Sequence, residues 1–214
     1  KKKKKLKIIP FSVPDFAPQV SEKKPSTLPS MPEKYGLFLG RLCYYKGVDV
    51  ILEALDLLVN RGVSLPVVLV GDGPLKGEIA QALEKKRLNH VVFIDRHVDE
   101  DEKNWLLMNA SYLLFPSTEP SEAFGIIQLE AMSYGVPVIN TNLPTGVPWV
   151  SEHENTGLTV PIRDAESLAN SMERMAGDEA KRKIMGQHAL HRVSDMFSDS
   201  TVSRRLIDQI NRFR

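Results

Sequence analysis

The fold of this chain is decided by GLFLGRLCYYKGVDVILEALDLLVNRGVSLPVVLV, residues 36–70. Two short apolar runs, Gly36–Leu39 and Val67–Val70, flank a stretch of helical length at Val48–Asn60. Apolar residues recur in that stretch at the spacing of a helix with one buried face. The predicted inner face comprises Val48, Ile51, Leu52, Leu55, Leu58 and Val59. Because neither run alternates with polar residues, we expect parallel strands covered by helices on both faces.

The same alternation of strands and helices continues to residue 163. Further strands are predicted at 91–94, 113–115, 136–139 and, at an edge, 157–160, and helices at 75–86, 100–110, 124–134, 164–176, 178–195 and 199–213. The sequence therefore predicts a doubly wound α/β domain with a mostly parallel, Rossmann-like sheet. We expect three parts: a strand and a proline-rich connection in 1–34, the domain in 35–198, and a C-terminal helix in 199–214.

The N-terminal part combines charge with apolar residues. Leu6–Ile9 is predicted to be a strand, and the lysine run Lys1–Lys5 is interpreted as a solvated linker in preference to a contact with anionic lipid. The chain opens on lysine, which indicates that it begins inside a longer polypeptide.

Composition limits the classes of function. The 214 residues, 42% hydrophobic, suit one well-buried domain. Lys and Arg number 28 against 27 for Asp and Glu, so the charge gives no reason to expect nucleic acid as a partner. The single cysteine, Cys43, fits a reducing compartment, and no apolar run reaches the roughly 20 residues that cross a bilayer. We expect a cytoplasmic protein, with peripheral contact at the inner face of the membrane as a further option.

Ligands of open parallel sheets bind beyond the carboxyl ends of the strands, so the loops there carry the functional evidence. The loop Gly40–Gly47 places Arg41 and Lys46 beside the start of a helix. A guanidinium, an ammonium and a helix N-terminus together suit a diphosphate, although both cations could also be solvated loop charges.

A second loop, Gly71-Asp72-Gly73-Pro74, follows the strand Val67–Val70. It lacks the dinucleotide-binding fingerprint, because Lys76 stands where the last glycine is required. A tight turn with Pro74 at the first helical position explains this loop better.

The third loop leads into a helix that is apolar nearly all round, apart from Gln128 and Glu130. Eight residues at about 1.5 Å rise place Glu130 roughly 12 Å along the axis from Glu122, a spacing that suits two hydroxyl-bearing rings with a diphosphate between them. The free N–H groups of Phe124, Gly125 and Ile126 would then face the phosphates. The alternative makes Glu122 a helix cap and Glu130 half of a buried ion pair.

Taken together, these loops resemble the C-terminal domain of the retaining glycosyltransferases of family 4, which have the two-domain GT-B fold. The resemblance runs from about Ile8 to the C-terminus and rests on an ordered set of motifs. These are Gly40-Arg41 to Lys46-Gly47, Gly71-Asp-Gly-Pro74, Glu122 to Glu130 continuing into Ala-Met, Gly135-Val-Pro-Val-Ile139, Gly146-Val-Pro148 and Asn155-Thr-Gly-Leu-Thr-Val-Pro161.

The resemblance implies a nucleotide-diphosphate sugar as donor, with neither metal nor cofactor required. It implies that Glu122 hydrogen-bonds the hydroxyls of the donor sugar and Glu130 those of the ribose. Arg41 and Lys46 would bind the diphosphate, together with the amides of Phe124, Gly125 and Ile126. It makes Arg96, His97 and Val98 candidates for the base pocket. It also implies that the acceptor-binding N-terminal domain is missing, so that this chain alone binds donor weakly and transfers nothing.

Three residues depart from the family pattern: Ala123 and Asp95 replace frequent glycines, and Trp149 stands where an acidic residue is common. Two other classes of function stay open. A glycosidase would need carboxylates about 5 to 9.5 Å apart, and a non-catalytic nucleotide-binding module would share the donor site. His188 and His191 lie one turn apart, but the sequence offers no third ligand for a metal.

Overall fold

The computed structural model describes residues 8–15, 17 and 21–212, and these contain a six-stranded parallel sheet. The strands are β1 (Gly36–Leu39), β2 (Val67–Val70), β3 (Val91–Ile94), β4 (Tyr112–Phe115), β5 (Val138–Thr141) and β6 (Gly157–Val160). Their order is β3-β2-β1-β4-β5-β6, with β6 at an edge. The predicted doubly wound α/β class is confirmed.

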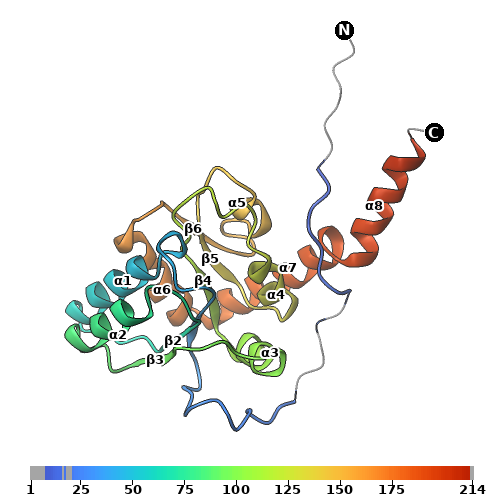
Figure 1. Cartoon of the computed structure of the whole chain (residues 1–214). Coiled ribbons are helices and arrows are strands. Elements are labelled where there is room, and N and C mark those ends of the chain that lie inside the picture. Colours follow the sequence, from blue (N-terminus) through green and yellow to red (C-terminus); the bar gives the residue numbers. More distant parts are fainter. Residues whose placement is uncertain (1–7, 16, 18–20, 213–214) are drawn as a thin grey trace.

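Helices cover both faces of this sheet, as Figure 1 shows. They are α1 (Val48–Asn60), α2 (Lys76–Lys85), α3 (Glu100–Asn109), α4 (Ile126–Ser133), α5 (Val147–Val150), α6 (Ala165–Gly177), α7 (Glu179–Met196) and α8 (Asp199–Asn211), with a 3-10 turn η1 (Tyr44–Lys46) before α1. One face packs against α1, α2 and α6, and the other against α3, α4 and α7. Most of α8 extends away from the domain (Figure 1).

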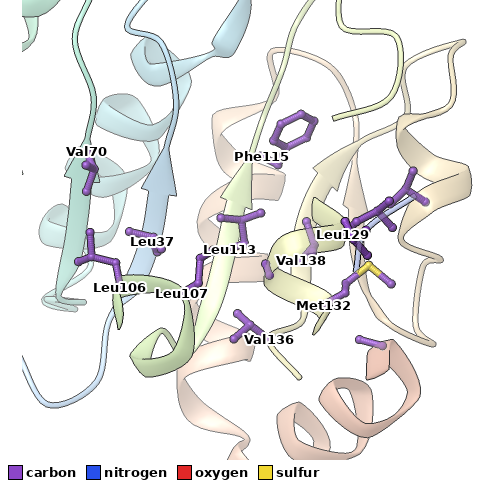
Figure 2. Close-up of a cluster of buried hydrophobic side chains, with 14 of the residues drawn as sticks. Leu37, Val70, Leu106, Leu107, Leu113, Phe115, Leu129, Met132, Val136 and Val138 are labelled. Carbon is purple, nitrogen blue, oxygen red and sulfur yellow. The ribbon is translucent and has the colours of Figure 1, made fainter. Parts of the chain in front are cut away.

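The core on the α3 and α4 side fixes the strand ends that carry the loops of interest. Figure 2 shows Leu107 of α3 and Leu129 of α4 gathered around Leu113 and Val138 of the sheet. All four side chains are fully buried, and burying each stabilises the fold by about 1.5–3 kcal/mol relative to an exposed position. The loops therefore start from a rigid base.

The predicted N-terminal strand is wrong where the structure describes it. Ile8 and Ile9 are exposed and belong to no strand, so they lack a sheet partner; Lys1–Lys5, with the linker and lipid interpretations, and Leu6–Lys7 lie outside the described residues. Val13 instead forms a bridge beside Ser198, donating to the carbonyl of Phe197 at 2.9 Å.

Smaller errors concern element ends and one side chain. The strand expected at 136–139 starts two residues later, because the amide of Val136 bonds to the carbonyl of Ala131 at the end of α4. The second loop also runs further than expected: α2 begins at Lys76, so Pro74 is not the first helical residue. Val59 is 38% exposed and is not part of the inner face of α1.

The strand order places a topological switch point between β1 and β4. From β1 the chain proceeds to β2 and β3 on one side and then returns to β4 on the other, which opens a crevice at the carboxyl ends of β1 and β4. The loop after β1 and the loop after β4 meet in this crevice. A Cβ on Gly47, which has φ +71°, would lie 2.0 Å from the carbonyl oxygen of Pro116. Only glycine permits this approach.

Candidate functional site

A cleft of about 570 Å³ lies at the carboxyl ends of β1, β2 and β3. It is lined by Leu39, Gly40, Arg41, Val70, Gly71, Asp72, Gly73, Arg96, His97, Val98 and Lys103. Four of the residues singled out from the sequence, Arg41, Arg96, His97 and Val98, thus share one cleft although they follow two different strands.

Arg41 lies exposed in this cleft, held by backbone contacts between two loops. The amide of Leu42 donates to the carbonyl of Asp72 at 2.9 Å, and a Cβ on Gly71 would lie 1.9 Å from the carbonyl oxygen of Gly40. The second loop is therefore a tight packing turn against the first. Within the described part of the chain, the guanidinium of Arg41 has no ion-pair or hydrogen-bond partner, so it is available to an anion.

Lys46 and Glu122 form a short, largely buried ion pair across the switch point, with side chains 16% and 11% exposed. The hydroxyl of Ser117 also donates to Glu122 at 3.3 Å. The ammonium of Lys46 lies 5.3 Å from the ring centroid of Phe115 and 5.4 Å from that of Tyr45, which adds cation–π attraction. The carboxylate and the ammonium hold each other at the junction of the two loops.

Helix α4 starts later than the sequence suggested. Its first residue is Ile126, because the preceding Gly125 has φ +78°, a left-handed backbone that does not belong to a right-handed helix. Glu122 thus lies in the loop before α4, so the estimate of roughly 12 Å along the helix axis between Glu122 and Glu130 does not apply. The prediction that Glu122 caps the helix is wrong, because Gly125 occupies the cap position. The amides of Phe124, Gly125 and Ile126 donate no hydrogen bond to any other described residue, and such free amides at a helix start suit an anion.

A buried amide network supports this turn from behind. The side-chain amide of Gln128 donates to the carbonyl of Phe124 at 2.8 Å and accepts from Asn140 at 3.0 Å. The amide of Gly146 donates to the carbonyl of Ala123 at 2.8 Å. With its carbonyls engaged on the inner side, the turn leaves its amides unpaired.

Glu130, on α4, is paired with Lys103 of α3 at 2.8 Å. The alternative prediction that Glu130 belongs to a buried ion pair is confirmed as to the pair. It is not confirmed as to full burial, because the Glu130 side chain is 29% exposed and reaches the surface beside the cleft. Burial disfavours the charged form of Lys103, but the hydrogen bonds that its ammonium donates to Glu130 and Glu100 raise its pKa above the usual value. Lys103 was not predicted as a site residue, although it is the only cation in α3, the helix that directly follows the candidate base loop.

Two of the departures from the family pattern have local partners. Asp95 pairs at 3.3 Å with Lys76, the residue that breaks the dinucleotide fingerprint. Trp149 packs edge-on against Phe197 at 5.1 Å and lies 6.2 Å from the ring of Phe124. An aromatic side chain therefore supports the turn before α4 from a position where the family often has an acid.

Gly125→Ala is expected to lower the free energy of unfolding by about 3 kcal/mol, against about 1 kcal/mol for Gly62→Ala. Both glycines have φ +78°, but a Cβ on Gly125 would lie 2.4 Å from the ring of Phe115, whereas Gly62 has nothing within 4 Å. Urea denaturation of the three chains measures both losses. Equal losses would contradict the close packing described for this turn.

A parallel sheet in this strand order, with a cleft at the carboxyl ends of its strands, defines a Rossmann-like domain of the kind that forms one half of a GT-B fold. The chain belongs to the family described as glycosyl transferases group 1, whose sequence model matches residues 19–192. The resemblance stated from the motifs is thus confirmed at the level of the family.

Two curated relatives are glycosyltransferases by name. The D-rhamnosyltransferase WbpZ of Pseudomonas aeruginosa is 36% identical over 77% of this chain and 42% of its own length. The O-antigen chain mannosyltransferase C of Escherichia coli is 30% identical over 91% of this chain and 51% of its own length. The chain therefore spans about half the length of the curated relatives that it matches.

Among solved structures, Anabaena HepE in complex with UDP-glucose superimposes with a TM-score of 0.70 at 23% identity. The match covers 84% of this chain and 48% of HepE, and at this identity it establishes the fold alone. Along the part of the chain that the structure describes, no helix is long and apolar enough to cross a bilayer.

Proposed function

We propose that this chain is the donor-binding half of a retaining glycosyltransferase that moves a hexose from a nucleotide-diphosphate sugar to a glycan, lipid or other acceptor. The observation that carries the proposal is the loop after β1, which holds both Arg41, without an acidic partner among the described residues, and Lys46. Lys46 pairs with Glu122 in the loop that leads to the free amides at the start of α4. Membership of the glycosyl transferases group 1 family supports it, as do the rhamnosyl- and mannosyltransferase names of the relatives and the UDP-glucose bound in HepE.

In this proposal the donor lies along the carboxyl edge of the sheet. The base occupies the cleft beside Arg96, His97 and Val98, where that cleft is lined by the loop after β3. Glu130, oriented by Lys103, accepts hydrogen bonds from the ribose hydroxyls. This places the nucleoside over β2 and β3 and directs the diphosphate toward the switch point.

The diphosphate then binds Arg41, Lys46 and the amides of Phe124, Gly125 and Ile126. An ammonium carries three N–H donors, so Lys46 can keep its bond to Glu122 while donating another to a phosphate oxygen. Glu122, held in this way, presents its remaining acceptor sites to the hydroxyls of the hexose. The ion pair is thus compatible with donor binding.

Charge stabilisation supplies the catalysis. As the bond from the anomeric carbon to the diphosphate breaks, negative charge grows on the leaving phosphate. The acceptor's hydroxyl oxygen bonds to the anomeric carbon, and its proton goes to that phosphate. In this proposal the cations and free amides stabilise that charge, and one well-placed donor of this type contributes about 3 kcal/mol. The scheme requires neither a nucleophilic side chain nor a metal.

A thermal-shift panel tests the proposal. A uridine-, guanosine- or adenosine-diphosphate hexose that binds the native state, present at about a hundred times its Kd, adds about 2.7 kcal/mol to the stability of that state. The melting temperature of the chain should then rise by about 5 °C with at least one of them. The Arg41→Ala chain serves as the matched control and should show a much smaller rise. No shift with any of the three would overturn the proposal.

The acceptor site belongs, in this proposal, to the half that the relatives have in addition. We therefore expect this chain to bind donor weakly and to transfer no sugar, whereas the intact enzyme transfers it. Each protein, the chain and the intact enzyme, is incubated with radiolabelled nucleotide sugar and an acceptor extract, and the label transferred to the acceptor is measured. Steady transfer by the chain alone would contradict the assignment of donor and acceptor sites to different halves. If the intact protein also transferred no sugar, the chain would be a nucleotide-sugar-binding module and not part of a transferase.

A further inference from the structure

Glu102, on α3, is a buried carboxylate that the proposed mechanism does not use. It is 2% exposed and accepts four hydrogen bonds. Arg96 donates from both terminal nitrogens, at 2.6 and 2.8 Å, Thr27 donates its hydroxyl at 2.5 Å, and the amide of Asp99 donates at 3.0 Å. A carboxylate offers about four lone-pair sites, so its acceptor capacity is filled.

Two of these donors bracket the loop that lines the cleft. Arg96 and Asp99 stand on either side of His97 and Val98, both of which face the cleft. Arg96 also donates to the carbonyl of His97 at 2.9 Å. One carboxylate thus holds both ends of this short wall, and it does so from behind, because Glu102 itself is not part of the cleft lining.

The third donor ties the wall to the proline-rich connection. Thr27 donates its hydroxyl to Glu102 and accepts from Arg96 through its own carbonyl at 3.1 Å. The next residue, Leu28, is 3% exposed and packs into the core. The connection is therefore anchored, and Glu102 joins it to α3 and to the loop after β3.

The ionised form of this carboxylate is strongly favoured. Hydrogen bonds from Arg96 lower the pKa of Glu102 to about 2 in spite of its burial, with help from Thr27 and the amide of Asp99. A glutamine in its place would keep the shape but offer one acceptor oxygen, and its NH2 group would face the donors of Arg96.

We propose that Glu102 is a positioning residue that fixes the His97–Val98 wall and thereby sets the affinity of the site for the nucleoside part of the donor. The inference rests on the proposed function. If Glu102 no longer holds the His97–Val98 wall, the affinity for the nucleoside should fall. The affinity for the diphosphate, which binds Arg41 and the turn at Gly125, should stay unchanged.

The test compares Glu102→Gln with Asp101→Asn, an adjacent and exposed carboxylate of the same helix. Calorimetric titration of the chain uses the tightest-binding of UDP, GDP and ADP, and inorganic pyrophosphate as the probe of the diphosphate end. At a temperature where circular dichroism shows both variants folded, Glu102→Gln should raise the Kd of the nucleoside diphosphate about tenfold. The Kd of pyrophosphate should change less than about twofold, and Asp101→Asn should change neither.

A milder variant keeps the inference testable if Glu102→Gln fails to fold. Thr27→Val removes one of the four donors without changing charge, and should raise the Kd of the nucleoside diphosphate about two- to threefold with pyrophosphate unaffected. Equal weakening of both probes, or of neither, would overturn the inference. If the unaltered chain binds no nucleoside diphosphate, the proposed function itself fails.

Discussion

Replacing Arg41 with alanine is expected to lower the turnover of the intact enzyme by about a hundredfold or more. The guanidinium lies exposed in the cleft with no acidic partner among the described residues, so no intramolecular bond is lost when it is removed. The whole effect should therefore fall on charge developing in the donor diphosphate. Steady-state kinetics with saturating acceptor measures it.

Lys85→Ala is the matched control, because Lys85 is an exposed cation on α2 with no ion pair among the described residues. It should turn over at the unaltered rate. The Arg41→Ala chain should also keep its melting temperature in the absence of ligand. A variant of Arg41 that remained within about threefold of the unaltered rate would contradict the role proposed for the guanidinium.

Replacing Lys46 with methionine is expected to affect stability and turnover together. The variant leaves the Glu122 carboxylate largely buried without its cation, which costs about 3–5 kcal/mol for a fully buried pair. Because both side chains retain some exposure, we expect a loss of about 2–3 kcal/mol in the free energy of unfolding. Turnover should fall by about a hundredfold or more, since the ammonium also contacts the leaving diphosphate.

A double variant separates the two effects. Lys46→Met combined with Glu122→Gln removes the unpaired charge and should recover most of the lost unfolding free energy, but none of the turnover. Urea denaturation and steady-state kinetics on the same preparations give both quantities. Recovery of turnover in the double variant would show that the pair is a structural feature only.

The fold could be predicted from the sequence because its strands are uninterrupted apolar runs and its helices have regular spacing. Val48–Asn60 and Gly157–Val160 have the predicted bounds. The start of α4 could not be predicted in this way. Its position depends on the left-handed backbone of Gly125, at a point where the ring of Phe115 leaves no room for a Cβ and Gln128 bonds to the carbonyl of Phe124.

The candidate site was predicted in outline only. Loops at the carboxyl ends of the strands could be assigned to one edge of the sheet, which singled out Arg41. The residues of the β3 loop were added only by the family resemblance. Partnerships between distant residues leave no local signal. Lys46 and Glu122 are 76 residues apart and meet where the loops after β1 and β4 approach, and Lys103 and Glu130 are 27 residues apart and meet where α3 packs against α4. No spacing in the sequence encodes either approach.

Amide NMR of the labelled chain, titrated with the nucleoside-diphosphate hexose that stabilises it most, shows which residues the donor contacts. We expect the amide shifts to concentrate at Lys46, Gly125 and Ile126 around the diphosphate and at His97 and Val98 around the base. The groove along α7 beside His188, which lies apart from this edge of the sheet, should stay unperturbed. Shifts confined to that groove, or absent from the turn at Gly125, would contradict the assignment of the donor site.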